Sequence, residues 1–538
     1  MLRESRPLPL FRKIQPLELV LGLLLVEVMA ALIITGLRIV ILGNSSSLVD
    51  DAYIALRFAH NAASGLGFVW NAGGPRVNGF TSLLYTFILV VVERAGGSSL
   101  AAAPLIGVFG AVISIGLAFL LLRHLNPDGA VENLTGAVLV GLSPHLWYWS
   151  KAGLETTFFA ALLMASALAY IRQWLGDVPP WGAGLLFALC AVTRPEGVLL
   201  FAATLVFDVV VRRRDGRTLL GSLQLLAGFS AVFIPIFIWA WSYFGEPLPN
   251  TYYAKTGALW LQLRGGWDYL ARSVPDVLAR SSLPVLLVFL FARRLRLQTL
   301  YVLYLVLVGL LVILFEGGDS FPLARFLVPC LPLMFILGTL GLAELTRRIG
   351  RTGRAALLAV LFLAAVIGFV PRNALAVLPK GQLLPQANES KFEYMEDPLP
   401  GFIVMGKALR AHAAPGQSIA TVPIGAIGYF SGLRVIDMAG LTDPYMAHEP
   451  LDPKYAASWN PGHDKGDGLY ILGQRPDFIQ LVDRLTSQPL PGVDQVGQQF
   501  KSVVEIWAAP EFHELYEFAP MRVEGGWYYN LYRLRAGG

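Results

Sequence analysis

Two adjacent carboxylates, Asp50 and Asp51, follow a long apolar run in a chain that is otherwise poor in charge. Further ionisable residues of both signs flank or follow later apolar runs, namely Glu155, Arg194, Glu196, Lys255, Asp319 and Arg325. A carboxylate can take a proton from a hydroxyl group, and cations can hold a phosphate or another anion. Together, these residue types predict a site that holds an anion while doing acid or base chemistry.

The composition is that of a membrane protein. Only 15% of the 538 residues are charged and 55% are hydrophobic, whereas soluble domains carry roughly a quarter charged residues. Apolar segments recur over residues 20–370, and an ordinary soluble composition follows. We therefore predict a polytopic α-helical membrane domain over 1–379 and a soluble α/β domain over 380–538. The net charge of +5 is too mild to indicate nucleic-acid binding.

Basic residues predict the orientation, because cytoplasmic loops are enriched in Lys and Arg. The basic tail before the first apolar run places the N-terminus in the cytoplasm, and Asp50 and Asp51 then lie outside, in a first outer loop over 43–79. If the short apolar run at 80–93 does not span, all later basic clusters fall inside and the C-terminal domain is extracytoplasmic. About eleven spans result, near 19–42, 100–122, 132–147, 155–174, 181–193, 196–211, 219–243, 280–292, 298–315, 326–345 and 354–371.

Each candidate residue also has a purely structural interpretation. Asp50 and Asp51 could cap an interfacial helix, and Arg194 could form a plain salt bridge at a helix break. An isolated basic residue such as Lys255 could reach toward lipid headgroups. The run 147–149, Trp-Tyr-Trp, is typical of an interfacial aromatic belt. The functional interpretation depends on the joint placement of the ionisable groups on one side.

Metal and disulfide chemistry find little support. The two cysteines, Cys190 and Cys330, lie in apolar segments, and the seven histidines show no metal-ligand spacing. We therefore predict no disulfide framework and no His-built metal site. A divalent metal could bind between carboxylates and a phosphate, although nothing in the sequence requires a cofactor.

The soluble domain alternates helical and strand-like patterns. A helix is predicted over 405–412, strands over 418–422, 434–437 and 476–482, and a hairpin of 517–523 with 527–534. Its aromatic residues could stack on sugars or form the core.

Several short motifs occur in order along the chain. They include Asp50-Asp51-Ala52-Tyr53-Ile54, Gly153-Leu154-Glu155-Thr156, Thr193-Arg194-Pro195-Glu196-Gly197, Pro249-Asn250-Thr251-Tyr252-Tyr253-Ala254-Lys255, Gly317-Gly318-Asp319 and Asp437-Met438-Ala439-Gly440-Leu441-Thr442-Asp443. As a set, these motifs resemble the GT-C superfamily of polyprenyl-phosphate-sugar glycosyltransferases. The resemblance is to the branch that contains the mycobacterial terminal β-(1→2)-arabinofuranosyltransferase.

The resemblance implies a GT-C fold and a multi-pass enzyme of the cell membrane that uses a lipid-linked sugar, decaprenyl-phosphate arabinofuranose. The acceptor would be a cell-envelope glycan, such as the arabinan of arabinogalactan or lipoarabinomannan. Asp50 or Asp51 would be the general base, and Glu155 would orient the donor or the base. The implied donor-binding residues are Arg194, Glu196, Asn250, Tyr252, Tyr253, Lys255, Asp319 and Arg325. The implied acceptor-binding residues are Asp443 and His448.

Two alternatives stay open. A GT-C transferase that modifies a surface protein or another polymer would carry the same motifs. A transporter or flippase for lipid-linked sugars would also need many helices and mixed charges, but it would place polar groups near the midplane. The sequence does not decide which of Asp50 and Asp51 is the base, or whether the sugar configuration is inverted or retained.

Overall fold

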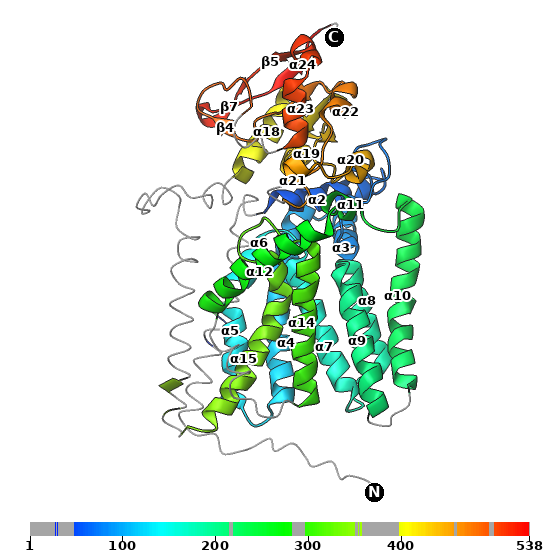
Figure 1. The fold of residues 1–538 in the computed structure, drawn as a ribbon, viewed down its shortest axis with the longest axis vertical. Helices are drawn as coiled ribbons and strands as arrows, with labels where there is room; N and C mark the ends of the chain where they lie inside the picture. Colours follow the sequence, from blue (N-terminus) through cyan, green and yellow to red (C-terminus); the bar gives the residue numbers. More distant parts are fainter. Residues whose placement is uncertain are drawn as a thin grey trace.

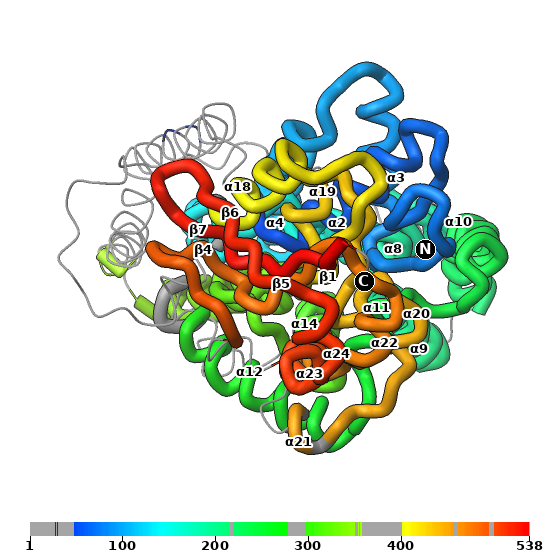
Figure 2. The backbone as a smooth tube through the Cα atoms, turned by 90° about the horizontal axis from the view of Figure 1, so that it is seen from above, coloured from blue at the N-terminus to red at the C-terminus, as the bar shows by residue number. Residues whose placement is uncertain are grey.

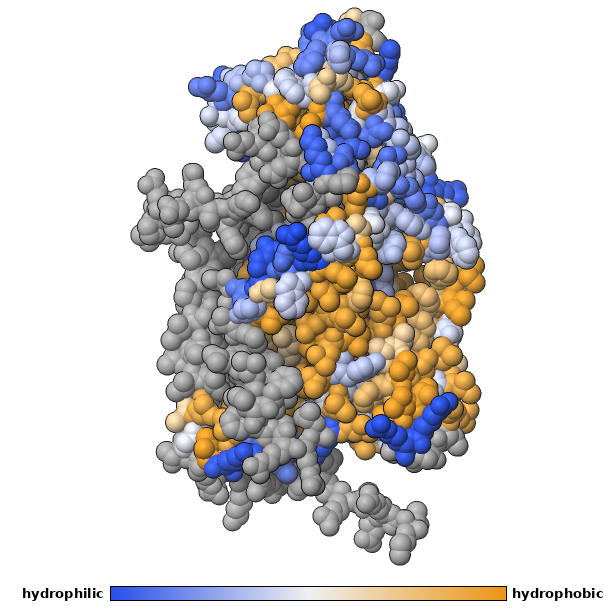
Figure 3. Space-filling view, in the orientation of Figure 1, coloured by the Kyte–Doolittle hydropathy of each residue, from blue (hydrophilic) through white to orange (hydrophobic). Residues whose placement is uncertain are grey.

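In the computed structural model, the described residues are 48–214, 219–281, 296–349, 398–456, 460–493 and 500–536, with a few isolated positions. A bundle of long helices forms one half of the molecule, and a smaller α/β domain lies on one end of it (Figure 1). Hydrophobic side chains cover the visible flank of the bundle, and hydrophilic ones gather on the α/β domain (Figure 3). The hydrophobic flank is the surface that would face lipid.

Four helices of the described chain are long and apolar enough to cross a membrane. They are α4 (Ser99–Leu125), α10 (Leu220–Phe244), α14 (Leu297–Glu316) and the run Arg325–Thr346, which joins η2 (Arg325–Cys330) to α15 (Leu331–Thr346). These helices coincide with the spans predicted near 100–122, 219–243, 298–315 and 326–345. Helices α8 (Pro180–Thr193) and α9 (Glu196–Arg214) lie at the predictions for 181–193 and 196–211. The predicted spans 19–42, 354–371 and almost all of 280–292 lie outside the described residues.

The prediction of one helix over 132–147 is wrong. Helix α5 (Ala130–Gly141) ends before Ser143, and α6 (Pro144–Lys151) begins with a proline, which is favoured at the first turn of a helix and disfavoured in its interior. Helix α6 is bent by 120° from α7 (Thr156–Gln173). The second bend passes through Gly153 with φ +76°, a conformation that favours glycine.

Two helices near the α/β end of the bundle do not have the character of spans. Helix α3 (Leu83–Arg94) has 12 residues and is therefore roughly 18 Å long, shorter than a membrane core of about 30 Å. Helix α12 (Leu259–Ser281) was not predicted. It exposes Trp260 and Trp267 and crosses the bundle obliquely in Figure 1.

The α/β domain is built on a five-stranded sheet of order β2-β1-β3-β8-β5. Strand β1 pairs in parallel with β2 and β3, and β8 is antiparallel to β3 and β5. A second, three-stranded sheet has the order β4-β7-β6. The strands are β1 (Ser418–Thr421), β2 (Arg434–Asp437), β3 (Phe478–Ile479), β4 (Leu485–Thr486), β5 (Tyr516–Phe518), β6 (Met521–Arg522), β7 (Tyr528–Tyr529) and β8 (Tyr532–Leu534). The predicted hairpin is thus present but shared between two sheets.

Short helices surround these sheets. They are α18 (Pro398–His412), α19 (Gly425–Ser431), α20 (Pro444–His448), α21 (Pro453–Ala456), α22 (Gly468–Gly473), α23 (Lys501–Ala508), α24 (Pro510–Leu515) and the 3-10 turn η4 (Glu524–Gly526). Two helices of the membrane domain lie under the α/β domain in Figure 1, α2 (Asp50–Ala63) and α11 (Asn250–Lys255). Seen from above, α11 lies beside α20 and α2 lies near α19 (Figure 2). The predicted site residues on α2 and α11 therefore lie where the two domains meet.

Candidate active site

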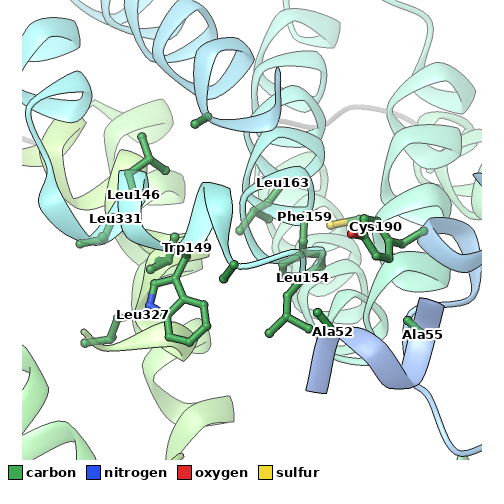
Figure 4. Packing of buried hydrophobic residues seen from close by; sticks show 14 of the residues in the cluster. Ala52, Ala55, Leu146, Trp149, Leu154, Phe159, Leu163, Cys190, Leu327 and Leu331 are labelled. Atoms are coloured by element: carbon green, nitrogen blue, oxygen red, sulfur yellow. The ribbon is translucent and has the colours of Figure 1, made fainter. Parts of the chain in front are cut away.

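The start of α2 is held against the turn between α6 and α7. Val49 donates its backbone N–H to the Ala152 carbonyl at 3.0 Å. A Cβ on Gly153 would come within 3.1 Å of the Ala52 Cβ, so this position needs glycine for the helix to approach. In Figure 4, Ala52 of α2 lies beside Leu154, one residue before Glu155. The two motifs that carry Asp51 and Glu155 are therefore neighbours in space.

Asp51 faces a cationic group, Arg325, at the start of η2. Its carboxylate lies 3.6 Å from Nη1 of Arg325, and the Asp51 side chain remains 33% exposed. Arg325 is held in place by Asp319, whose two carboxylate oxygens accept from Nε and Nη2 at 2.7 and 2.9 Å. Arg325 therefore joins two predicted site residues, because it contacts both Asp51 and Asp319.

Arg325 is also enclosed by aromatic rings. Its guanidinium carbon lies 5.8 Å from the ring centre of Trp149, 4.5 Å from that of Phe321 and 5.0 Å from that of Phe326. Trp149 is fully buried and donates its Nε1–H to the Leu323 carbonyl at 3.0 Å. The interpretation of Trp149 as part of an interfacial belt is therefore wrong, because this ring forms a wall of the site.

Asp50 has a different partner from Asp51. Its carboxylate accepts from the backbone N–H groups of Gly425 (3.1 Å) and Ala426 (2.7 Å) at the start of α19. Successive residues on a helix point about 100° apart, so one acid reaches the α/β domain while the other faces Arg325. Asp50 therefore holds the domains together, and Asp51 is the candidate base.

The pKa of Asp50 predicts a pH effect on this contact. Burial raises the pKa of Asp50 to about 6, although the Ala426 N–H opposes the shift. Because the folded pKa exceeds the unfolded one, the stability contributed by Asp50 is complete below about pH 4 and is lost as the pH rises through 6. We expect the melting temperature of the wild type, relative to Asp50→Asn, to fall by a few degrees between pH 4 and 7. Thermal unfolding in detergent checks this, and a constant difference over that range would contradict it.

Arg57 is a second contact between the domains that the sequence did not reveal. This buried guanidinium donates to the carbonyl oxygens of Trp70 (2.9 Å), Gly428 (2.5 Å) and Leu433 (2.7 Å). A buried cation needs several acceptors to offset the loss of water. The α/β domain is therefore fixed on α2 by two charged residues, Asp50 and Arg57.

Glu155, Arg194 and Glu196 form one buried ionic cluster. Arg194 donates from Nη1 to Glu155 at 3.2 Å and from Nε to Glu196 at 2.8 Å. A cavity of about 30 Å³, lined by Arg194, Glu196, Glu316 and otherwise mainly apolar side chains, adjoins the cluster. Glu316 ends an apolar run in the sequence, and this position could have identified it as an ionisable residue next to the cluster.

Lys255 is the last residue of α11, and the charges of Asp51 and Arg325 both act on its ammonium group. Burial lowers the pKa of Lys255, and the Asp51 carboxylate opposes this shift. Among the described residues, no carboxylate lies within 4 Å of Lys255, whereas Arg194 and Arg325 are both paired. Lys255 is therefore the cation best placed to take a phosphate.

The other predicted residues of the α11 motif lie at the rim or between domains. Asn250 is buried and donates to the carbonyl oxygens of Gly440 and Leu441, both at 2.9 Å, so its assignment to a sugar pocket is replaced by a structural role. Tyr252 is 50% exposed. Tyr253 stacks on His448 with ring centres 4.4 Å apart. These three rings form an outer rim around the end of α11.

Asp443 does not face the membrane site. Its carboxylate caps α20 by accepting the N–H of Met446 at 3.2 Å, and its other oxygen accepts from the Tyr470 hydroxyl at 3.1 Å. Asp is a favoured residue at this capping position. The prediction that Asp443 contacts the acceptor is therefore replaced by a structural role. Within the described parts of the chain, no three His, Cys, Asp or Glu side chains converge as a metal site.

Comparisons with known proteins cover the α/β domain by a family model and most of the chain by solved structures. Residues 389–532 match a family model described as "Domain of unknown function (DUF8728)". No curated protein matches the sequence. Three solved structures show the following similarities.

ArnT from Cupriavidus metallidurans in the apo state is 14% identical over 77% of this chain and 85% of its own, with a TM-score of 0.50. ArnT bound to undecaprenyl phosphate is 12% identical with the same coverage, and its TM-score is 0.49. The third structure is the oligosaccharyltransferase AglB from Archaeoglobus fulgidus in complex with an inhibitory peptide and a dolichol-phosphate. It is 12% identical over 85% of this chain and 69% of its own, with a TM-score of 0.47. The likeness to apo ArnT shows that the chain shares the overall fold of that protein.

Proposed function

We propose that the chain is a membrane glycosyltransferase that moves a sugar from a polyprenyl-phosphate donor to a cell-envelope glycan. The observation that carries the proposal is the convergence of a partly exposed carboxylate, Asp51, with the cations Lys255 and Arg325 under the α/β domain. Sugar transfer from a lipid phosphate needs both kinds of group. A base must activate the acceptor, and cations must stabilise the phosphate that leaves.

The proposed reaction assigns one role to each side of the site. Asp51 takes the proton of an acceptor hydroxyl as that oxygen forms a bond to the anomeric carbon of the donor sugar. The bond between that carbon and the phosphate oxygen breaks, and its electron pair leaves with the polyprenyl phosphate. Lys255 binds the charge that grows on this phosphate, and Arg325 orients Asp51 and adds positive potential.

The position of Asp50 bears on stereochemistry. Its carboxylate is engaged by Gly425 and Ala426, and Glu155 is engaged by Arg194. Asp50 and Glu155 are thus both occupied. Among the three proposed catalytic acids, no second free carboxylate is left beside Asp51 to serve as a nucleophile. We therefore propose a single displacement, which inverts the anomeric configuration and would give an α linkage from a β-linked donor, whereas the β-(1→2) product of the resembled branch would require retention from such a donor.

The lipid carrier is supported by the fold. ArnT shares this fold, and one of its structures contains undecaprenyl phosphate. The apolar flank of the bundle (Figure 3) would hold a polyprenyl chain in the membrane while its phosphate enters at the end near Lys255. The proposed identities of the donor sugar and of the acceptor are based on the sequence motifs alone. They favour decaprenyl-phosphate arabinofuranose and an arabinan of arabinogalactan or lipoarabinomannan, with residues 380–538 contacting the acceptor through His448 and nearby rings.

The proposed orientation places the N-terminus in the cytoplasm and the site outside. Ser98 caps α4 next to the site end of the bundle and is exposed. We expect a Ser98→Cys variant to react with a membrane-impermeant maleimide on intact cells, and Arg213→Cys to react only after lysis. The native Cys190 and Cys330 are buried, so background labelling should be low. Labelling of position 213 rather than 98 from outside would reverse the topology.

The activity itself is tested by donor competition. Purified protein is incubated with several polyprenyl-phosphate sugars and a synthetic arabinan, and products are identified by mass. Pentosyl transfer from the arabinofuranose donor is the expected result. Transfer of another sugar would keep the enzyme class and change the substrate, and absence of transfer with every donor would overturn the function.

A further inference from the structure

A segment of the α/β domain, residues 460–467, reaches down to the proposed phosphate site. Gly462 has φ +87° and lies so close to Lys255 that a Cβ there would come within 3.2 Å of the lysine Cε. Lys465 is buried and donates from Nζ to the Tyr253 carbonyl at 2.8 Å. The segment is therefore held directly against α11.

Internal hydrogen bonds fix the shape of this segment. Both carboxylate oxygens of Asp464 accept the backbone N–H of Asn460, at 3.1 and 2.8 Å. Asp467 caps the following helix by accepting the N–H of Tyr470 at 2.8 Å. Lys465 makes a second bond to the Ala447 carbonyl at 2.7 Å. The residue between these anchors, His463, is thus presented from a constrained backbone.

His463 faces the same charged groups as the proposed substrate. Its Nδ1 is buried and has no hydrogen-bond partner among the residues that the structure describes. Burial lowers the pKa of His463, the Asp51 carboxylate raises it, Lys255 lowers it further, and the Pro461 carbonyl of the same segment raises it. The two residues that act on the imidazole from outside its own segment are therefore the proposed base and the proposed phosphate ligand.

The chemistry of the ring indicates what it would bind. A buried polar atom without a partner is costly, so such an atom in a site is commonly completed by a ligand. A neutral imidazole has one donor and one acceptor nitrogen. A sugar hydroxyl both donates and accepts, so it can pair with Nδ1 in either tautomer, whereas the phosphodiester of the donor only accepts and would need a protonated Nδ1. The ring therefore suits a hydroxyl better than a second phosphate contact.

We propose that His463 is a substrate-binding residue, whose Nδ1 hydrogen-bonds a hydroxyl group of a sugar lying between Asp51 and Lys255. This inference rests on the proposed glycosyltransferase function and deepens it, because it makes the α/β domain a part of the site. The hydroxyl belongs either to the donor sugar or to the acceptor sugar, and kinetics can separate the two.

The test compares full-length wild type with His463→Ala and His463→Gln, using polyprenyl-phosphate arabinofuranose and a synthetic arabinan. We expect His463→Ala to lower kcat/KM about tenfold or more, and His463→Gln, which keeps a hydrogen-bonding amide, to recover part of the loss. A rise in the donor KM would assign the hydroxyl to the donor. A rise in the acceptor KM would assign it to the acceptor. His412→Ala, at an exposed position of the same domain, serves as the control.

A merely structural role is distinguished by the glutamine variant and by stability. Equal melting temperatures with a lower kcat/KM in His463→Ala support the proposal. Unchanged KM and kcat for both substrates in a wild type that transfers sugar would overturn the role of His463 alone. A wild type that transfers no sugar would instead overturn the proposed function.

Discussion

Replacing Asp51 by asparagine should lower kcat for sugar transfer by about 10²- to 10⁴-fold, the range expected for loss of a general base. The amide cannot take the acceptor proton, but it keeps the size of the side chain. Donor affinity should change little, because Asp51 faces the acceptor oxygen in the proposed reaction. Initial rates with a radiolabelled lipid-linked sugar measure the effect, and a binding assay with the same lipid measures donor affinity.

Asp50→Asn is the matched control for this prediction. It removes the same charge one residue away, where the carboxylate bonds to Gly425 and Ala426. We expect this variant to keep kcat within about tenfold, with the main change in the stability of domain docking. Loss of activity in Asp50→Asn together with normal turnover in Asp51→Asn would exchange the two roles and refute the assignment.

Replacing Lys255 by alanine should raise the donor KM roughly 10- to 100-fold, as expected for the loss of a hydrogen bond to a charged group. It should also lower kcat, because the charge on the phosphate grows as the sugar leaves. Steady-state kinetics with varied donor concentration checks both effects. Lys454→Ala removes an exposed lysine from the α/β domain and should change neither.

Lys255 is a cleaner probe than Arg325. Removing Arg325 would leave Asp319, whose side chain is 5% exposed, without its partner, and unpaired buried charges destabilise strongly. An unchanged donor KM in a folded Lys255→Ala variant would remove this residue from the phosphate role. The binding of the phosphate would then have to rest on Arg194 or Arg325, both already paired with carboxylates.

The sequence predicted the membrane helices well where composition alone determines them. Long apolar runs such as 219–243 and 298–315 needed no tertiary information, because about 20 apolar residues suffice to span a membrane. The break between α5 and α6 was missed because hydropathy continues across Gly141 and Pro144. Helix α12 was missed because its apolar residues are spread along an amphipathic face.

For the candidate site, too, some features could be predicted from the sequence and others could not. Clustering of Asp51, Lys255, Asp319 and Arg325 could be predicted from charge and from their placement on one side of the bundle. The separate roles of Asp50 and Asp51 could not, because they depend on the α/β domain that packs on α2. The same domain gives Asn250 a structural role and brings His463 to the site. Contacts between segments about 200 or more residues apart leave no local pattern in the sequence.

The most direct test of the account is a structure of the protein with a bound polyprenyl-phosphate sugar. We expect the phosphate within hydrogen-bonding distance of Lys255 Nζ, the sugar under residues 460–467, and Asp51 facing the anomeric carbon from the side opposite the phosphate. A phosphate bound at the cytoplasmic end of the bundle, or a sugar with no contact to Asp51 or Lys255, would contradict the central claim.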